Sequence, residues 1–391
     1  MKRERGVERA AWALLFLFVF TVPFEKSIAF DGLGTISRLL GILVFLLAGF
    51  AFATGRPLRP PNLLLVLSAV FASWMALTSL WSIAPEATWT RAATCAQLLV
   101  MLWLVWDLVR SRYRQTALCS AYVAGAAVAS AATIARYVQN EQTYYRRYAA
   151  AGFDPNDLGL TLALSIPLAL YVSERARGLA RWACWAAIAL AEAGVLLTWS
   201  RSALVASFIA FAFVALRWRS SGAVQRAAGV ALAGLLIIGA LTLAPATSRN
   251  RLAEFEEHAG TLHGRTRIWK AGVKAWVPHA VAGVGAGAYP AAVEPWLGVP
   301  AIPGHQYVAH NAFLSVMVEG GVIGLALFGA MLAAAIVFTW MLSASDRALW
   351  LVMLAVWFPG AATLTWEYRK PTWLILALIS TAWARAFREE T

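Results

Sequence analysis

Long apolar runs separated by short polar stretches make up most of this 391-residue chain. Most runs approach the roughly 20 residues that an α-helix needs to cross the hydrocarbon core of a bilayer. They predict twelve membrane-spanning helices, at residues 10–24, 34–54, 62–82, 91–110, 116–136, 156–174, 181–199, 201–217, 224–245, 311–341, 347–364 and 371–387. The pattern therefore predicts an all-α polytopic membrane protein whose residues 1–391 form a single transmembrane domain.

One long polar segment, residues 246–310, interrupts this pattern. Irregular polar backbone cannot face lipid, so the segment must lie outside the bilayer or line a cavity. We expect a long outward loop with short amphipathic helices. All five histidines of the chain lie in this loop, together with the cations Arg249, Arg251, Arg265, Arg267, Lys270 and Lys274. Such a cluster at one membrane surface points to chemistry on something anionic.

Composition supports the membrane assignment and narrows the function classes. Hydrophobic residues make up 60% of the chain, charged residues make up 14%, and there are 19 tryptophans, which favour bilayer interfaces. The net charge of +13 does not indicate nucleic-acid binding, because the positive-inside bias of membrane proteins explains much of it. With the N-terminus in the cytoplasm, the predicted inside loops are 55–61, 111–115, 173–181, 218–223 and 343–346.

The segment 264–276 has helical periodicity and carries two different kinds of cation. Arg267, Lys270 and Lys274 fall on one face, which either contacts lipid headgroups or binds an anionic substrate. Arg265 instead shares the face of Trp269. A guanidinium on a buried face needs an anionic partner, because an unpaired buried charge is costly. We therefore treat Arg265 as a candidate anion ligand.

Two further positions could take part in the same chemistry. His310 and Asn311 open the helix at 311–341, where Asn311 either only caps the helix or also favours an anion at the helix N-terminus. His310 is either an interfacial side chain or a base that works near neutral pH. Arg201 lies at the outer end of its span, beside the loop, where it either reaches lipid headgroups or binds a second phosphate oxygen.

Metal ligands are not apparent in the sequence. His258 and His263 are five residues apart without an evident third ligand, and no carboxylate cluster suits Mg²⁺ or Mn²⁺. Cys95, Cys119 and Cys184 lie inside apolar runs, which is typical of small core residues. Arginines rather than a metal are therefore expected to balance phosphate charge, and no cofactor is expected.

The chain resembles the O-antigen ligase/polymerase superfamily over about Arg147 to Gly324. The matching residues are Asp154-Pro155-Asn156, Ser200-Arg201-Ser202, Gly264-Arg265, Trp269, Pro278, Gly283-Val284-Gly285, His310-Asn311, Leu314, Glu319-Gly320 and Gly324. The resemblance implies an inverting, metal-independent glycosyltransferase of the bacterial inner membrane that acts at the periplasmic face. Its ligases move O-antigen from undecaprenyl pyrophosphate to the lipid A–core.

The resemblance also implies roles for individual residues. Arg265 and Arg201 are expected to bind the donor pyrophosphate, with His310 near the attacking hydroxyl. Apart from the resemblance, Asn311 and Arg147 are further candidates for donor binding, and the aromatic segment around Arg147 could equally be an interfacial belt. Arg267, Lys270 and Lys274 are the candidates for acceptor binding, and membrane lipids are further expected partners. The absence of a large outward domain after the last span favours a ligase over the family's protein O-oligosaccharyltransferases. An O-antigen or exopolysaccharide polymerase remains an alternative, and a transporter is a weaker one, because the polar groups gather at one face.

Overall fold

The computed structural model describes residues 2–143, 147–217, 262–298 and 306–389. Its long helices are α1 Lys2–Thr21, α2 Ile36–Ala53, α3 Leu63–Leu77, α4 Pro85–Leu108, α5 Arg112–Val138, α6 Pro155–Ser173, α7 Gly178–Thr198, α8 Arg201–Arg217, α13 Ala312–Trp340, α14 Ala344–Thr363 and α15 Lys370–Glu389. Each corresponds to one of the expected spans. The remaining expected span, 224–245, lies outside the described residues.

Short elements occupy the connections between the long helices. They are η1 Val22–Ser27, the hairpin β1 Ala29–Phe30 and β2 Gly34–Thr35, η2 Thr78–Leu80, α11 Leu262–Trp276, η4 Val277–His279, α12 Tyr289–Val293 and η5 Glu294–Trp296. The expected long loop at 246–310 is described only at 262–298 and 306–310. In those parts it contains the amphipathic helix α11 and the short helix α12, as the pattern predicts.

Eight helices of the described chain are long and apolar enough to cross a membrane: α1, α2, α3, α4, α5, α6, α7 and α13. The protein is thus a multi-pass helical membrane protein. Burial differs greatly among the helices. Almost every residue of α6 is buried, and α15 is buried continuously over residues 371–382, whereas α2 exposes large apolar side chains such as Leu46 and Phe50. Helices α6 and α15 therefore lie inside the bundle, and α2 presents an apolar outer surface suited to lipid.

Helix starts follow local capping rules. The side chains of Asn62, Ser111, Asp154 and Asn311 each accept a hydrogen bond from a backbone N–H in the first turn of α3, α5, α6 and α13. Proline occupies the first position of α4 and α6, where its missing N–H costs nothing. The polar residues between the apolar runs therefore set where these helices begin.

Helix α13 is broken at Gly321, whose φ of 69° and ψ of −169° are not helical. The break frees backbone groups, and the segment before α12 satisfies them. The N–H groups of Val284 and Gly285 donate to the carbonyls of Val318 and Glu319, each at 3.0 Å. In return, the N–H of Val322 donates to the carbonyl of Ala280 at 2.8 Å. A Cβ on Gly321 would lie 2.1 Å from the carbonyl oxygen of Val281, so only glycine permits this approach.

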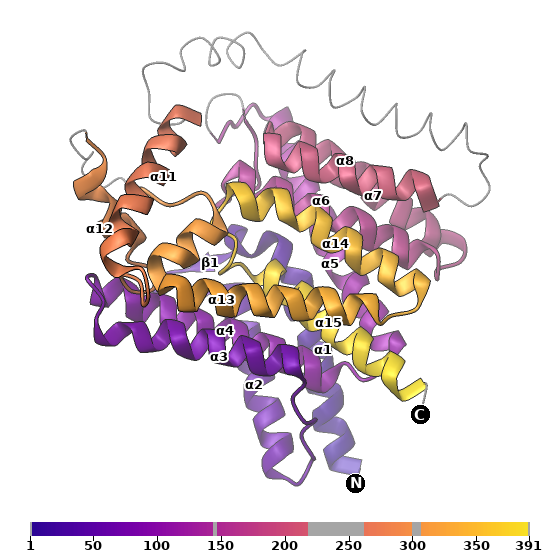
Figure 1. Ribbon diagram of the computed structural model, residues 1–391. Helices are drawn as coiled ribbons and strands as arrows, with labels where there is room; N and C mark the ends of the chain where they lie inside the picture. Colours follow the sequence, from indigo (N-terminus) through magenta and orange to yellow (C-terminus); the bar gives the residue numbers. More distant parts are fainter. Residues whose placement is uncertain (1, 144–146, 218–261, 299–305, 390–391) are drawn as a thin grey trace.

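The segment with α11 and α12 packs at one end of the bundle, beyond the ends of α3, α4 and α13 (Figure 1). We call this the α11 end. The Asp157 carboxylate joins several connections there, because it accepts hydrogen bonds from Lys26 at 3.1 Å and Trp366 at 3.0 Å and pairs with Arg369 at 2.7 Å. A buried carboxylate with this many partners ties the α14–α15 connection to η1 and α6.

A second set of ion pairs lies at the opposite end of the bundle. Asp107, at the end of α4, pairs with Arg56 at 2.6 Å and Arg110 at 2.9 Å. Asp346, in the first turn of α14, pairs with Arg385 at 2.6 Å, and Arg112 and Arg175 lie within 4 Å of it. Arg56, Arg112 and Arg175 belong to loops expected to face the cytoplasm, Arg110 directly precedes one of them, and Arg385 lies near the end of α15. Their gathering at one end agrees with the charge bias used to predict orientation.

Candidate functional site

Helix α11 carries the two kinds of cation on different surfaces. Ile268, Ala271 and Ala275 are buried, and the opposite positions Arg267, Lys270 and Lys274 are exposed. Arg265, in the first turn, is half-buried, as is Trp269 one turn later. The division predicted from the periodicity is therefore confirmed. Arg265 faces the protein, whereas the stripe Arg267, Lys270 and Lys274 faces outward.

Arg201 is held at the first position of α8 by an unusual turn. Helix α7 ends at Trp199, which has a left-handed φ of 48°, and Ser200 leads directly into α8. The Ser200 hydroxyl accepts from the N–H of Ala203 at 3.4 Å. The reversal places the exposed Arg201 at the start of α8. Left-handed backbone is uncommon at residues other than glycine, and the examples that occur cluster at functional sites.

Arg147 joins two of the expected motifs to each other. Its Nε donates to the carbonyl of Thr198 at 2.7 Å, and its Nη2 donates to Oδ1 of Asn156 at 2.8 Å. One arginine thus connects the turn before Arg201 with the capped start of α6. This contact makes Arg147 a supporting residue of the site, whether or not it also contacts the donor. Arg146, beside it in sequence, lies outside the described residues.

Arg265, Arg201 and Asp154 form one electrostatic group although they come from three distant parts of the chain. Burial lowers the pKa of Arg265 below its ordinary value, the charge of Arg201 lowers it further, and Asp154 opposes both effects. An arginine remains charged in spite of such a shift. The half-buried Arg265 and the exposed Arg201, with one nearby carboxylate, leave an excess of positive charge. This arrangement favours an anion with more than one oxygen.

The backbone that carries His310 is joined to α11. The Nε1 of Trp269 donates to the carbonyl of Ala309 at 2.7 Å, one turn after Arg265 and one residue before His310. His310 itself is half-buried and has a left-handed φ of 47°. The described structure therefore brings the loop before α13 to the same helix as Arg265. Both non-glycine left-handed residues at this site, Trp199 and His310, stand at expected site motifs.

Asn311 uses its side chain within the protein. Its Oδ1 accepts from the N–H of Leu314 at 2.9 Å, which confirms the capping interpretation, and its Nδ2 donates to the carbonyl of Ala362 at 3.2 Å. The second bond ties the start of α13 to the end of α14. These two contacts account for Asn311 as a structural residue, and its direct binding of the donor remains a prediction.

Two buried acids lie close to each other, Glu319 within α13 and Glu367 in the α14–α15 connection. The sequence motifs include Glu319 but not Glu367. Glu319 is 2% exposed and Glu367 is fully buried. Burial, followed by the charge of Glu319, raises the pKa of Glu367, in the α14–α15 connection, to about 8. Arg91 and Tyr368 complete the cluster, with the guanidinium 4.2 Å from the ring centroid. Arg91 was detectable as a cation at the start of an apolar run, but its partners lie more than 200 residues away.

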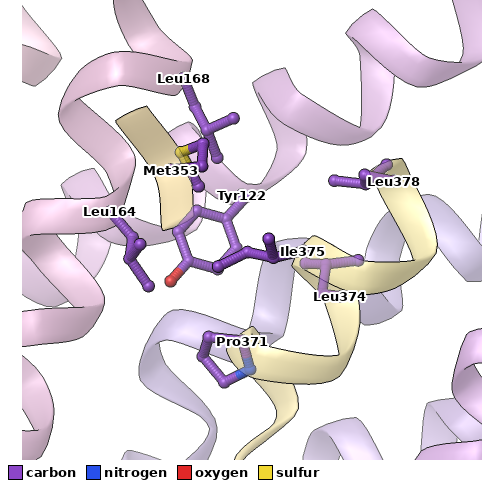
Figure 2. Close-up of a pocket in the computed structure, with 8 residues that line it drawn as sticks. All are labelled: Tyr122, Leu164, Leu168, Met353, Pro371, Leu374, Ile375 and Leu378. Carbon is purple, nitrogen blue, oxygen red and sulfur yellow. The ribbon is translucent and has the colours of Figure 1, made fainter. Parts of the chain in front are cut away.

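In the part of the chain that the structure describes, neither a group of metal ligands nor a pocket lies at this site. No three His, Cys, Asp or Glu side chains come close enough there to hold a metal ion. His258, His305 and the side chain of His263 lie outside the described residues. A small pocket lies between α5, α6, α14 and α15, lined by apolar side chains and Tyr122 (Figure 2). The Tyr122 hydroxyl donates to the carbonyl of Thr161, so this pocket is a packing gap in the core.

The structure thus describes a multi-pass helical membrane protein in which Arg265, Arg201 and Asp154 act on one another electrostatically at one end of the bundle. The family model described as O-antigen ligase matches residues 185–329. This match supports the resemblance seen in the sequence, and it covers 145 of the 391 residues. Arg201, Arg265, His310 and Asn311 lie within the matched residues, and Arg147 and Asp154 precede them. No curated protein matches the chain.

Proposed function

We propose that this protein is an O-antigen ligase of the bacterial inner membrane. It transfers O-antigen polysaccharide from undecaprenyl pyrophosphate to the lipid A–core at the periplasmic face. The observation that carries the proposal is the electrostatic group of Arg265, Arg201 and Asp154 at the α11 end. A pyrophosphate presents several oxygens to such a pair of guanidinium groups, which bind phosphate in a bidentate manner.

The donor diphosphate lies against Arg265 and Arg201, with its polyprenyl tail in the bilayer. The acceptor hydroxyl attacks the anomeric carbon from the side opposite the diphosphate, so the configuration at that carbon inverts. A bond forms between the acceptor oxygen and the anomeric carbon as the bond from that carbon to the diphosphate oxygen breaks. Undecaprenyl pyrophosphate leaves with the electron pair, and the two arginines stabilise the charge that develops on it. This route needs no divalent cation.

His310 takes the proton of the acceptor hydroxyl as the new bond forms. Its position supports this role, because it lies at the entrance to α13 on backbone that Trp269 holds against α11. An imidazole changes protonation near neutral pH, which suits a base that must accept a proton and release it again. The left-handed φ of His310 directs the side chain differently from a helical first-turn residue.

The exposed stripe Arg267, Lys270 and Lys274 binds the phosphorylated lipid A–core acceptor. Three cations along one surface of α11 favour a ligand with several negative charges, and the same helix carries Arg265 on its inner side. The stripe would therefore bring the acceptor to the side of the site opposite the bundle. The polymerase alternative uses a second lipid-linked glycan as acceptor, and the choice of acceptor in an assay separates the two.

We expect purified protein to transfer glycan from undecaprenyl pyrophosphate to lipid A–core, and to do so equally with EDTA present. The measurement is formation of the capped lipid, followed by mass spectrometry, with boiled protein as control. Elongation of the lipid-linked glycan without any transfer to lipid A–core would assign a polymerase. Loss of transfer with EDTA and its recovery with Mg²⁺ would contradict the metal-independent route.

Replacing Arg265 by Lys should lower kcat/KM about 10–100-fold. Lys keeps the charge but loses one of the two hydrogen bonds of a bidentate guanidinium–phosphate contact, and each such bond contributes about 1.5–3 kcal/mol. The measurement is initial transfer rate against donor concentration. Arg136→Lys is the matched control, since Arg136 lies at the same end and pairs with Glu141 away from the site. An Arg265→Lys enzyme with wild-type kcat/KM would refute bidentate binding.

His310→Ala should lower kcat by about 10²–10⁴-fold with little change in the donor KM, because only the proton transfer is lost. The control is His279→Ala, which removes an exposed imidazole elsewhere in the same segment. Steady-state rates over a range of pH give the second readout, since loss of the base should also remove the corresponding limb of the rate profile. A His310→Ala enzyme with the wild-type kcat would exclude the base role.

Reversing the charge of Lys270 and Lys274 to Glu should raise the KM for lipid A–core at least about tenfold, because each reversed charge replaces attraction by repulsion. Donor KM should stay unchanged. Arg38→Glu together with Arg136→Glu reverses two cations at the same end outside α11 and serves as control. If the acceptor KM of the Lys270 and Lys274 variant equals that of the control, the stripe only contacts membrane lipid.

A further inference from the structure

Glu319 lies where α13 breaks, two residues before Gly321, and is 2% exposed. Its main-chain carbonyl accepts a hydrogen bond from the N–H of Gly285 at 3.0 Å. A Cβ on Gly283 would lie 2.3 Å from the same carbonyl oxygen, so the outward segment passes directly against the backbone of Glu319. The main chain of this residue therefore forms part of the contact between the bundle and the segment that leads from α11 to α12.

The side chain of Glu319 reaches three other parts of the protein. Its Oε2 accepts a hydrogen bond from the hydroxyl of Tyr368 at 3.1 Å, in the α14–α15 connection. The backbone N–H groups of Gly287 and Tyr289 interact with the same carboxylate, and so does the charge of Arg91 on α4. A carboxylate in low-dielectric surroundings is stable only with such a set of partners. Glu319 thus joins α4, α13, the start of α12 and the α14–α15 connection.

A short path leads from this carboxylate to the site. Tyr289, whose N–H meets Glu319, donates its hydroxyl to the carbonyl of Ile268 on α11 at 3.1 Å. Gly272 allows the contact, since a Cβ there would lie 2.5 Å from the Tyr289 hydroxyl. Ile268 is three residues after Arg265 and immediately before Trp269, which bonds the carbonyl of Ala309. Tyr289 therefore links Glu319 to α11, beside the direct packing of α11 on α13.

Glu367 provides an internal comparison for Glu319. Both acids are buried and both feel the charge of Arg91. The Glu367 carboxyl interacts with the Ser315 hydroxyl on α13, whereas the carboxylate of Glu319 meets the Tyr368 hydroxyl and the backbone N–H groups of Gly287 and Tyr289 in the outward segment. The two acids therefore share burial and the neighbour Arg91, but they contact different parts of the protein. Of these two acids, Glu319 is the one that contacts the outward segment.

We infer that Glu319 is a positioning residue, which holds α11 against the bundle through Tyr289 and so keeps Arg265 in register with Arg201 and Asp154. The inference rests on the proposed function for its catalytic consequence, but the contact itself is a property of the fold. Register matters because displacement of a binding group by about 1 Å can cost 10²-fold in rate. Glu319 takes no part in bond making or proton transfer.

The test replaces Glu319 by Gln and uses Glu367→Gln as the matched control. A carboxamide keeps the size of the side chain but loses the charge toward Arg91 and one of the two acceptor oxygens. We expect faster hydrogen exchange of the backbone amides of residues 265–293 in Glu319→Gln, with unchanged exchange in α6 and α15. We also expect kcat/KM for the donor to fall about 10²-fold, mainly through KM, while the pH dependence of the rate keeps its wild-type shape. Glu367→Gln should match the wild type in both measurements.

Two results would overturn the inference. One is wild-type exchange and wild-type kcat/KM in Glu319→Gln, which would show that the contact of the Glu319 carboxylate does not position α11. The other is loss of activity with unchanged exchange, which would place Glu319 in the chemistry. If Glu319→Gln does not accumulate, Tyr368→Phe removes one donor to the carboxylate. Unchanged exchange of residues 265–293 in that variant contradicts the positioning role of Glu319. If wild-type protein transfers no glycan, the proposed function fails, and the exchange measurement still decides the role of Glu319.

Discussion

The break in α13 at Gly321 is the constraint on which the rest of this architecture depends. A helix interrupted inside a membrane protein exposes carbonyl and amide groups that lipid cannot satisfy. Here the segment 280–285 and the Trp74 indole, which donates to the carbonyl of Gly320 at 2.8 Å, supply the partners. The outward segment is therefore bound to the bundle by the backbone as well as by side-chain packing. Its position cannot shift without leaving polar groups unpaired at that break.

This attachment explains how charges from distant parts of the chain form one site. Arg265 enters on α11, which is seated on the broken helix through Tyr289, and Arg201 enters from the reversal between α7 and α8. Asp154 caps α6 and opposes the two cations, and Arg147 ties the α6 start to the α7 end. The excess of positive charge is sustained by this rigid framework. A preorganised pair of guanidinium groups stabilises a developing diphosphate charge without reorganising during the reaction.

Charge has a different role at the two ends of the bundle. At the end away from α11, Asp107 pairs with Arg56 and Arg110, and Asp346 pairs with Arg385 of α15, so these cations have carboxylate partners within the protein. At the α11 end, Asp157 is likewise surrounded by Lys26, Arg369 and Trp366. Arg265 differs because, among the described residues, the charges that act on it are those of a second arginine, Arg201, and one carboxylate, Asp154. The contrast separates structural ion pairs from a site that favours an added anion.

The sequence by itself determined the elements. Apolar runs of bilayer length, capping residues such as Asp154 and Asn311, and the two-faced periodicity of 264–276 depend on neighbours within a few turns, so the helices and the buried side of Arg265 were predictable. Only the tertiary structure decided which elements meet. Nothing local indicates that the segment 280–285 fills the break at Gly321, that Glu319 faces Tyr368, or that Arg91 lies over the ring of a residue 277 positions later. Those contacts follow from burying polar groups with partners, a condition that the folded chain satisfies as a whole.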